Sequence, residues 1–244
     1  MGQATSGSPI LSQHLLLGVA EELKLPLLQI ARLSEQALDE QAQAAGQSNL
    51  KTIQATADSA LRLLDGYALG VRLALESGQL AVESVSVSSV LYDTGQQLDS
   101  LAKSYGVALE LNIAGRFAPV LANRQGLQAA LVSLGAALIE ALPAQAGASP
   151  QLKLQLATHR SRYGVVAGLY ADTKQLSNDA LASGRQLQQS SRQPLTKLTH
   201  TSGAGIFVAD TILQAMKLRL GASRHHRLYG LGTVLQPNCQ LQLV

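Results

Sequence analysis

The residues of this chain that could do chemistry are few and lie far apart in the sequence. Ser89, Asp93 and His14 offer a hydroxyl, a carboxylate and an imidazole, but their separations match no arrangement of a nucleophile with its base. Cys239 is the single cysteine, so it can form no internal disulfide and has no cysteine partner for a zinc site. These residue types predict no hydrolytic, redox or zinc centre.

Two short motifs remain as candidates for binding an anion. Gly203 and Gly205 precede an expected helix, whose first N–H groups could receive a phosphate. Glycines before a helix are also simply permissive backbone, and both interpretations stay open. The cluster from Arg224 to Arg227 holds two adjacent histidines, which point in different directions on a helix or a strand. We expect a solvated turn there, with an anion or metal contact as the alternative.

The elements that must position these residues begin with two helices. Apolar residues repeat in steps of four and three before and after a break at Gly46. One seam contains Leu16, Ala20, Leu23, Leu27 and Ile30, and the other contains Ile53, Ala57, Ala60, Leu64, Tyr67 and Val71. The pattern predicts a helical hairpin over residues 9–78, after a flexible N-terminus over residues 1–8.

Each predicted helix also carries leucines away from its seam, such as Leu28 and Leu61. A lone hairpin would leave this apolar surface in water, whereas a second copy of the hairpin would bury it. We therefore expect a homodimeric four-helix bundle. The expected dimer interface contains Leu16, Leu23, Leu27, Ile30, Ile53 and Leu64.

The sequence pattern changes after Gly78, where alternating apolar residues and shorter helical segments predict a second domain over residues 79–244. The expected helices are at about 88–105, 123–141 and 205–220, and the expected strands at about 80–87, 107–113, 151–158, 165–170, 232–235 and 240–243. The polar stretch 173–202 predicts a loop with one short helix. The fold class is therefore α+β, with an α/β sandwich after the hairpin.

Composition excludes several classes of protein. Apolar residues make up 46% and charged residues 14% of the 244, which suits a packed globular protein and does not suit a disordered chain. A net charge of +3, with 3% aromatic residues, argues against nucleic-acid binding. No stretch reaches the roughly 18 uninterrupted apolar residues of a membrane span, and no signal peptide is recognisable. We expect a cytoplasmic protein with no membrane span.

Several strings, in this order, resemble the catalytic core of sensor histidine kinases. The stretch 20–27, which reads Ala-Glu-Glu-Leu-Lys-Leu-Pro-Leu, resembles the box that holds the phosphoacceptor histidine, and Pro26 matches its helix kink. Residues 75–80, followed by residues 87–91, resemble the passage from the second hairpin helix into the next domain. Residues 127–138 resemble the helix with the Asn box, and 202–206 the second glycine box. The resemblance implies a dimerisation and phosphoacceptor hairpin followed by an ATP-binding domain of the gyrase/Hsp90/kinase type.

The resemblance also implies that the phosphotransfer chemistry is lost. Glu21 occupies the place of the phosphoacceptor histidine, and a carboxylate cannot form the phosphoramidate that is passed to a response regulator. Glu22 matches the acidic residue of the family but has no imidazole to assist. Leu25 stands where phosphatase members keep Thr or Asn, and it offers no hydrogen bond. We expect no catalytic residue among Glu21, Glu22, Leu25 and Pro26.

The implied ATP site is eroded in the same way. Ser133 and Ala137 replace the two asparagines that hold Mg²⁺ and phosphate in the family. Asp172 matches the aspartate that reads adenine, although an aspartate that ends a strand also has an ordinary structural explanation. The Gly-x-Gly that should follow Asp172 is absent, while Gly203 and Gly205 match the second glycine box. We expect ATP or ADP binding to be weak, independent of Mg²⁺ or absent, and no bound metal.

These features favour a homodimeric signalling pseudokinase or scaffold. Its expected partner is a response-regulator receiver domain or another histidine kinase, and Glu21 is hypothesised to imitate the charge of phosphohistidine. The alternative is an active or nucleotide-binding histidine kinase with a divergent ATP site. A phosphotransferase that receives phosphate from elsewhere would need a histidine on the bundle, and we expect His14 to be a surface or packing residue.

Overall fold

The computed structural model describes residues 79–113, 115–145, 152–172 and 204–238, together with single helical residues between positions 23 and 73. Leu23, Pro26 and Ile30 lie in one helical segment, and Ile53 lies in a second. The described residues of the expected hairpin are 23, 26, 28–30, 32–33, 53, 57, 60–61, 65–66, 68–70 and 72–73. Its other residues, the polar stretch 173–203 and the expected strand 240–243 lie outside the described residues.

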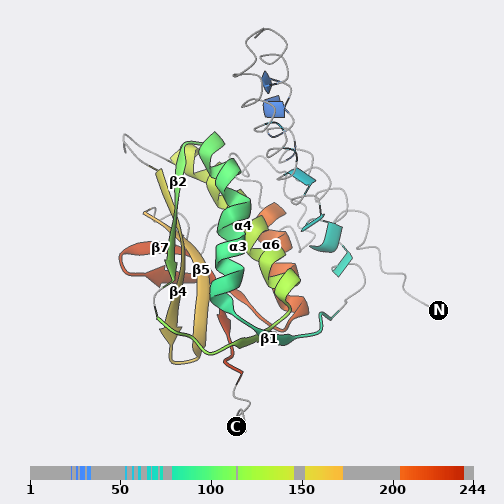
Figure 1. Ribbon diagram of the computed structural model, residues 1–244, viewed down its shortest axis with the longest axis vertical. Coiled ribbons are helices and arrows are strands. Elements are labelled where there is room, and N and C mark those ends of the chain that lie inside the picture. Colours follow the sequence, from blue (N-terminus) through green and yellow to red (C-terminus); the bar gives the residue numbers. More distant parts are fainter. Residues whose placement is uncertain are drawn as a thin grey trace, which may run out of the picture.

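A five-stranded mixed sheet forms one layer of the domain (Figure 1). The strand order is β2-β4-β5-β7-β6, in which β2 and β4 are parallel and the other neighbours are antiparallel. The bounds are β2 (Val107–Ile113), β4 (Leu152–Ser161), β5 (Gly164–Ala171), β6 (Leu220–His225) and β7 (Leu228–Leu235). A separate short pair joins β1 (Glu83–Val85) to β3 (Val120–Ala122) in antiparallel register.

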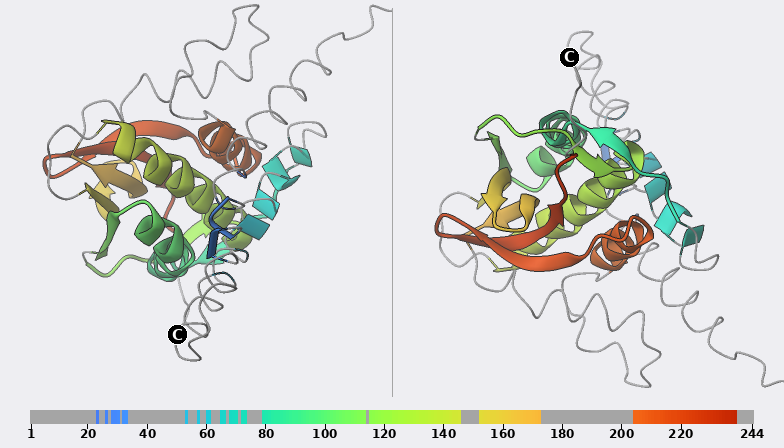
Figure 2. Two further views of the ribbon diagram at one scale, coloured as in Figure 1. Left: turned by 90° about the horizontal axis from the view of Figure 1, so that it is seen from above. Right: turned by 90° about the horizontal axis from the view of Figure 1, so that it is seen from below.

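Three helices cover one face of this sheet, namely α3 (Val87–Ser104), α4 (Arg124–Gln145) and α6 (Ala204–Ala215). Figure 2 shows α4 lying between α3 and α6, with all three on the same side of the sheet. Side chains of β5 alternate between the two faces of the sheet, which explains this arrangement. Val165 and Leu169, with their partners Leu235 and Leu231 on β7, belong to the core beneath the helices. The expected α+β class, with a helix layer packed on a mixed sheet, is confirmed.

Local capping signals set where the helices begin. The Ser86 side chain accepts a hydrogen bond from the Ser89 N–H at 3.5 Å and starts α3. Before α4, Asn123 Oδ1 accepts from the Gly126 N–H at 2.9 Å, while its Nδ2 donates to the Ala81 carbonyl at 2.9 Å. Asn123 therefore both caps α4 and ties it to the segment before β1.

The end of α6 corrects the sequence prediction, which continued this helix to residue 220. The N–H of Leu218 donates to the carbonyl of Leu213 at 2.9 Å, and that of Lys217 donates to Gln214 at 2.8 Å. This is the Schellman arrangement, with Lys217 in the left-handed region at φ 60°. The chain then turns directly into β6, a strand that the sequence analysis did not predict.

One described helix has the length and hydropathy of a membrane span. The segment Arg124–Leu142 of α4 has a mean hydropathy of 1.4, but 78% of it is buried inside the fold. Its apolar character is accounted for by the core, because α4 packs against α3, α6 and the sheet.

Candidate functional site

The two positions that the resemblance matches to the Asn box lie on one face of α4. Ser133 and Ala137 are one helical turn apart, and they are 1% and 3% exposed. The Ser133 hydroxyl is buried and has no hydrogen-bond partner among the described residues. This face of α4 is therefore packed against protein rather than open to solvent.

Two glycines of the second hairpin segment provide part of this packing. A Cβ placed on Gly66 would lie 3.1 Å from Ser133 Oγ, and one on Gly70 would lie 2.8 Å from Val208 Cγ1 on α6. Leu69 also packs against the hydrophobic core. Figures 1 and 2 show the teal helical segment of the hairpin on the side of α4 and α6 that faces away from the sheet. The hairpin segment thus covers the helix face that carries Ser133.

This packing limits what the face can bind. Mg²⁺ in nucleotide sites takes several oxygen ligands and keeps bound waters. Ala137 supplies no oxygen, and the single hydroxyl of Ser133 faces the backbone of Gly66. Among the described residues, no group of three or more His, Cys, Asp or Glu side chains is arranged to hold a metal ion.

The remaining candidate nucleotide residues are distributed over two elements. Asp172 is exposed directly after β5, and Gly205 is buried in the first turn of α6. Gly203 lies outside the described residues. The structure thus brings Ser133 and Ala137 together on α4, while Asp172 and Gly205 stand on other segments. Their assignment to a nucleotide site stays a prediction.

The phosphoacceptor box is described at one position. Pro26 is helical and buried, while Glu21, Glu22 and Leu25 lie outside the described residues. Among the expected interface residues, Leu23, Ile30 and Ile53 are helical and partly buried. Leu16, Leu27 and Leu64 lie outside the described residues, so the dimer interface stays a prediction.

Glu140 is a residue of this region that the sequence analysis missed. It lies seven residues after Ser133 on α4, and therefore on nearly the same helix face. Burial raises the pKa of its carboxyl to about 7. A signal existed in the sequence, because Glu140 is the only charged residue of α4 after Arg124.

A second polar cluster lies on the opposite face of the sheet. The Tyr170 and His225 ring centroids are 5.4 Å apart, and those of His159 and His225 are 5.2 Å apart. Burial, with a smaller contribution from His226, lowers the pKa of both His159 and His225. The predicted solvated turn is right for exposed His226 and wrong for His225, which is 6% exposed.

Tyr170 reaches across the sheet within this cluster. Its hydroxyl and that of Ser223 on β6 are 3.2 Å apart and share a hydrogen bond. A Cβ on Gly168 would lie 2.8 Å from the Tyr170 hydroxyl oxygen, so only glycine leaves room for the ring on the sheet. Burial raises the pKa of the Tyr170 phenol, and the bond to Ser223 partly offsets this rise.

Comparison with known proteins identifies the fold. No protein-family model and no curated protein matches the sequence. A solved bacterial phosphotransferase is 10% identical, with a TM-score of 0.52, over 94% of this chain and 98% of that chain. The histidine kinase AdeS of Acinetobacter baumannii is 14% identical, with a TM-score of 0.48, over 88% of this chain and 96% of that chain. Full-length ShkA in complex with AMPPNP is 16% identical, with a TM-score of 0.49, over 92% of this chain and 44% of that chain.

At these identities the likeness establishes the fold and leaves the activity open. The loss of the phosphoacceptor histidine and of the Asn-box ligands rests on the sequence resemblance alone. The expected α+β architecture is confirmed: this chain shares the fold of the solved bacterial phosphotransferase.

Proposed function

We propose that this chain is a two-component signalling pseudokinase, which binds a response-regulator receiver domain or a partner kinase through a dimeric helical bundle. The observation that carries the proposal is the burial of Ser133 and Ala137, with Gly66 lying against the Ser133 hydroxyl. A kinase needs this helix face open to Mg²⁺ and phosphate, and here it is closed by packing.

The replaced phosphoacceptor supports the same conclusion from a different part of the chain. Glu21 cannot act as the imidazole nucleophile, and its negative charge would repel an incoming phosphoryl group. A protein without both functions can still present a docking surface. The expected bundle supplies one, with Glu21 as a fixed negative charge on it.

Nucleotide binding can be tested by thermal unfolding with ATP or ADP and Mg²⁺. A ligand at about 100 times its Kd stabilises a protein by about 2.7 kcal/mol, which raises the Tm of a chain of this size by roughly 5–10 °C. We expect no such rise at millimolar nucleotide. A clear rise would favour the alternative, a nucleotide-binding histidine kinase with a divergent site.

Phosphotransfer can be tested with γ-labelled ATP on two proteins. The native protein and the Glu21→His variant are both expected to incorporate no label, because the variant restores the acceptor and leaves Ser133 and Ala137 covered. Labelling of the variant alone would show that the ATP site works and that only the acceptor is lost. Labelling of the native protein would establish an active kinase.

Partner binding depends on the bundle and is tested separately. Light scattering should give twice the 25.6 kDa mass of one chain. A receiver domain immobilised at increasing density should capture the native protein, and Glu21→Gln should weaken this capture. Equal capture of both proteins would remove Glu21 from the interface, and a monomer in solution would overturn the bundle.

The likeness to a solved phosphotransferase favours a second candidate function, a protein that receives a phosphoryl group from another protein. This function requires a histidine acceptor, and His14 is the histidine of the predicted hairpin. Incubation with a phosphorylated receiver domain, followed by assay of acid-labile phosphate, would detect it. Transfer that disappears in His14→Gln would establish this function in place of the pseudokinase.

A further inference from the structure

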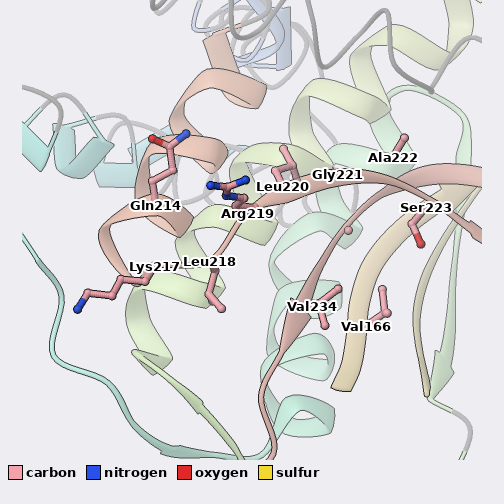
Figure 3. A pocket seen from close by; sticks show the side chains of 11 residues that line it. Val166, Gln214, Lys217, Leu218, Arg219, Leu220, Gly221, Ala222, Ser223 and Val234 are labelled. Atoms are coloured by element: carbon pink, nitrogen blue, oxygen red, sulfur yellow. The ribbon is translucent and has the colours of Figure 1, made fainter. Parts of the chain in front are cut away.

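A groove runs along the free edge of β6, on a part of the domain remote from Ser133. Its volume is about 840 Å³, and it is lined by Arg219 and the first half of β6, by the end of α6 and by outward-facing residues of β5 and β7. Figure 3 shows Val166 and Val234 side by side on the sheet, with Gln214 and Arg219 on the helix side. The groove therefore has an apolar floor and a polar rim.

The backbone of β6 is available for pairing at this groove. Among the described strands, β6 is an edge strand whose one neighbour is β7. His225 and Leu228 are partners across a two-residue turn, and such a closing pair is hydrogen-bonded. Because hydrogen-bonded and non-hydrogen-bonded pairs alternate along antiparallel strands, the pairs Arg224–Tyr229 and Ala222–Leu231 are non-hydrogen-bonded. The N–H and C=O groups of Ala222 and Arg224 consequently point away from β7. Both residues are exposed.

The edge is held in place at its start. Asp210 of α6 is buried, and its Oδ1 accepts a hydrogen bond from the Leu220 N–H at 3.4 Å. Its Oδ2 accepts from Gln214 Nε2 at 3.0 Å. The strand is thereby fixed to the helix beside it, so that an incoming segment would meet a preformed edge.

Charge decides which kind of segment this edge would accept. Residues 211–244 contain Lys217, Arg219, Arg224 and Arg227, and they contain no Asp or Glu. These four side chains enter none of the ion pairs formed among the described residues. A second copy of β6 would place like charges side by side, which disfavours pairing. An acidic segment would be attracted instead.

We propose that the β6 edge is a docking site for an acidic extended peptide segment of a partner protein, which adds to the sheet as a further strand. Ala222 and Arg224 supply the backbone hydrogen bonds, and the apolar floor receives alternate side chains of the peptide. Arg219 and Lys217 attract its carboxylates. This site is independent of the helical bundle and of any nucleotide.

The site is tested on the full chain with a fluorescent peptide of alternating Glu and Val, by fluorescence anisotropy at low and high salt. The native protein should bind it more weakly as salt rises, and a Lys–Val peptide of the same length should bind at least about tenfold more weakly. Arg219→Glu should weaken binding at least about fivefold. Arg116→Glu, which changes the net charge equally at an exposed residue outside the groove, should leave binding within about twofold.

A backbone change separates strand addition from simple charge attraction. Ala222→Pro removes one outward N–H and should weaken binding roughly tenfold, because one hydrogen bond to the peptide is lost. The variant should still fold, because proline is tolerated where an edge N–H faces solvent. The same Glu–Val peptide with alternate backbone nitrogens methylated should fail to bind the native protein, which tests the hydrogen bonds even where Ala222→Pro does not fold. Absence of binding up to ~1 mM peptide would overturn the proposal, as would equal losses in Arg219→Glu and Arg116→Glu. Preference for a single-stranded oligonucleotide over the peptide would overturn it too.

Discussion

The native protein should lose stability as pH rises because Glu140 is buried, and Glu140→Gln should not show this part of the fall in the free energy of unfolding. Glu140 is the one charged residue of α4 after Arg124, and burial raises the pKa of its carboxyl from 4.5 to about 7. Burial is the cause because it disfavours the charged form of a carboxyl group. The folded protein therefore holds a proton on Glu140 over a pH range in which the unfolded chain has released it.

The sign and size of the effect follow from this difference. Below pH 4.5 the carboxyl is protonated in both states, so its ionisation costs the fold nothing. As the pH rises from 4.5 to 7 the unfolded state loses its proton first, and the free energy of unfolding falls until the pH passes 7. A difference of 7 − 4.5 = 2.5 pH units corresponds to about 3.4 kcal/mol. Glu140 is only partly buried, which reduces our expectation to about 2–3 kcal/mol.

The assay is urea unfolding of the native protein and Glu140→Gln, followed by circular dichroism at pH values from below 4.5 to above 7. The two free energies of unfolding should agree at the acid end and diverge as pH rises, with the variant more stable. Glu110→Gln is the matched control. Glu110 is half-buried, and the hydrogen bond that its carboxylate accepts from Lys153 Nζ, 2.8 Å long, lowers its pKa. This variant should lose stability relative to the native protein as pH rises, which is the opposite sign.

A constant difference between native protein and Glu140→Gln across this range would refute the reasoning. So would a variant that is less stable than the native protein above pH 7, because Glu140 would then be stabilised as a carboxylate by hydration or by a cation. The unfolding transition and its m-value must stay unchanged for the comparison to hold.

Three further predictions concern packing and backbone. Gly70→Ala places a Cβ 2.8 Å from Val208 Cγ1, and this overpacking should lower the free energy of unfolding by about 1–3 kcal/mol. In a double-mutant cycle measured by urea unfolding, the cost of Gly70→Ala should be smaller when Val208→Ala is also present. Ser133→Asn should lower Tm without creating ATP-dependent stabilisation, because the larger side chain meets Gly66; a nucleotide-induced rise in Tm would contradict this. Lys217→Gly should raise the free energy of unfolding by about 1 kcal/mol, because φ 60° is strained for lysine; unchanged or lower stability would contradict it.

The sequence predicted those elements whose pattern is local. The strand Val107–Ile113 was predicted with the bounds that the structure has, and β4, β5, α3 and α4 differ from their predicted bounds by a few residues. In each of these elements the apolar residues follow the strand or helix period over a segment long enough for the period to be recognised. The strand β3 was missed because three residues, Val120–Ala122, are too few to show an alternation.

β6 was missed for a different reason. A helix that ends in a Schellman arrangement usually has glycine in the left-handed position, and here that position is Lys217. No stop signal therefore separates the apolar pattern of α6 from Leu220, and the predicted helix continued into the strand. Leu220 to His225 contains glycine, serine and charged residues typical of an exposed edge, which hide its strand character.

Sequence reasoning identified Ser133 and Ala137 but could not predict what covers them. The contact of Gly66 with Ser133 joins residues far apart in the chain, and periodicity within either helix does not reveal it. Glu140, in contrast, was visible as a lone charge in an apolar helix. The phosphoacceptor box at Glu21 stays a prediction from the resemblance.

The loss of metal ligands that the resemblance implies and the packing of the Ser133 face both depend on small side chains. Small residues allow two helices to approach closely: Gly66 lies against Ser133 of α4, and Gly70 lies against Val208 of α6. An asparagine in place of Ser133 would supply an oxygen for Mg²⁺ and would also hold the hairpin segment away. Serine is a poor metal ligand and alanine is none, and the small Ser133 side chain leaves room for Gly66. A small residue at position 133, where the resemblance implies an asparagine, thus permits this packing, so Ser133→Asn is expected to disturb the fold before it creates a metal site.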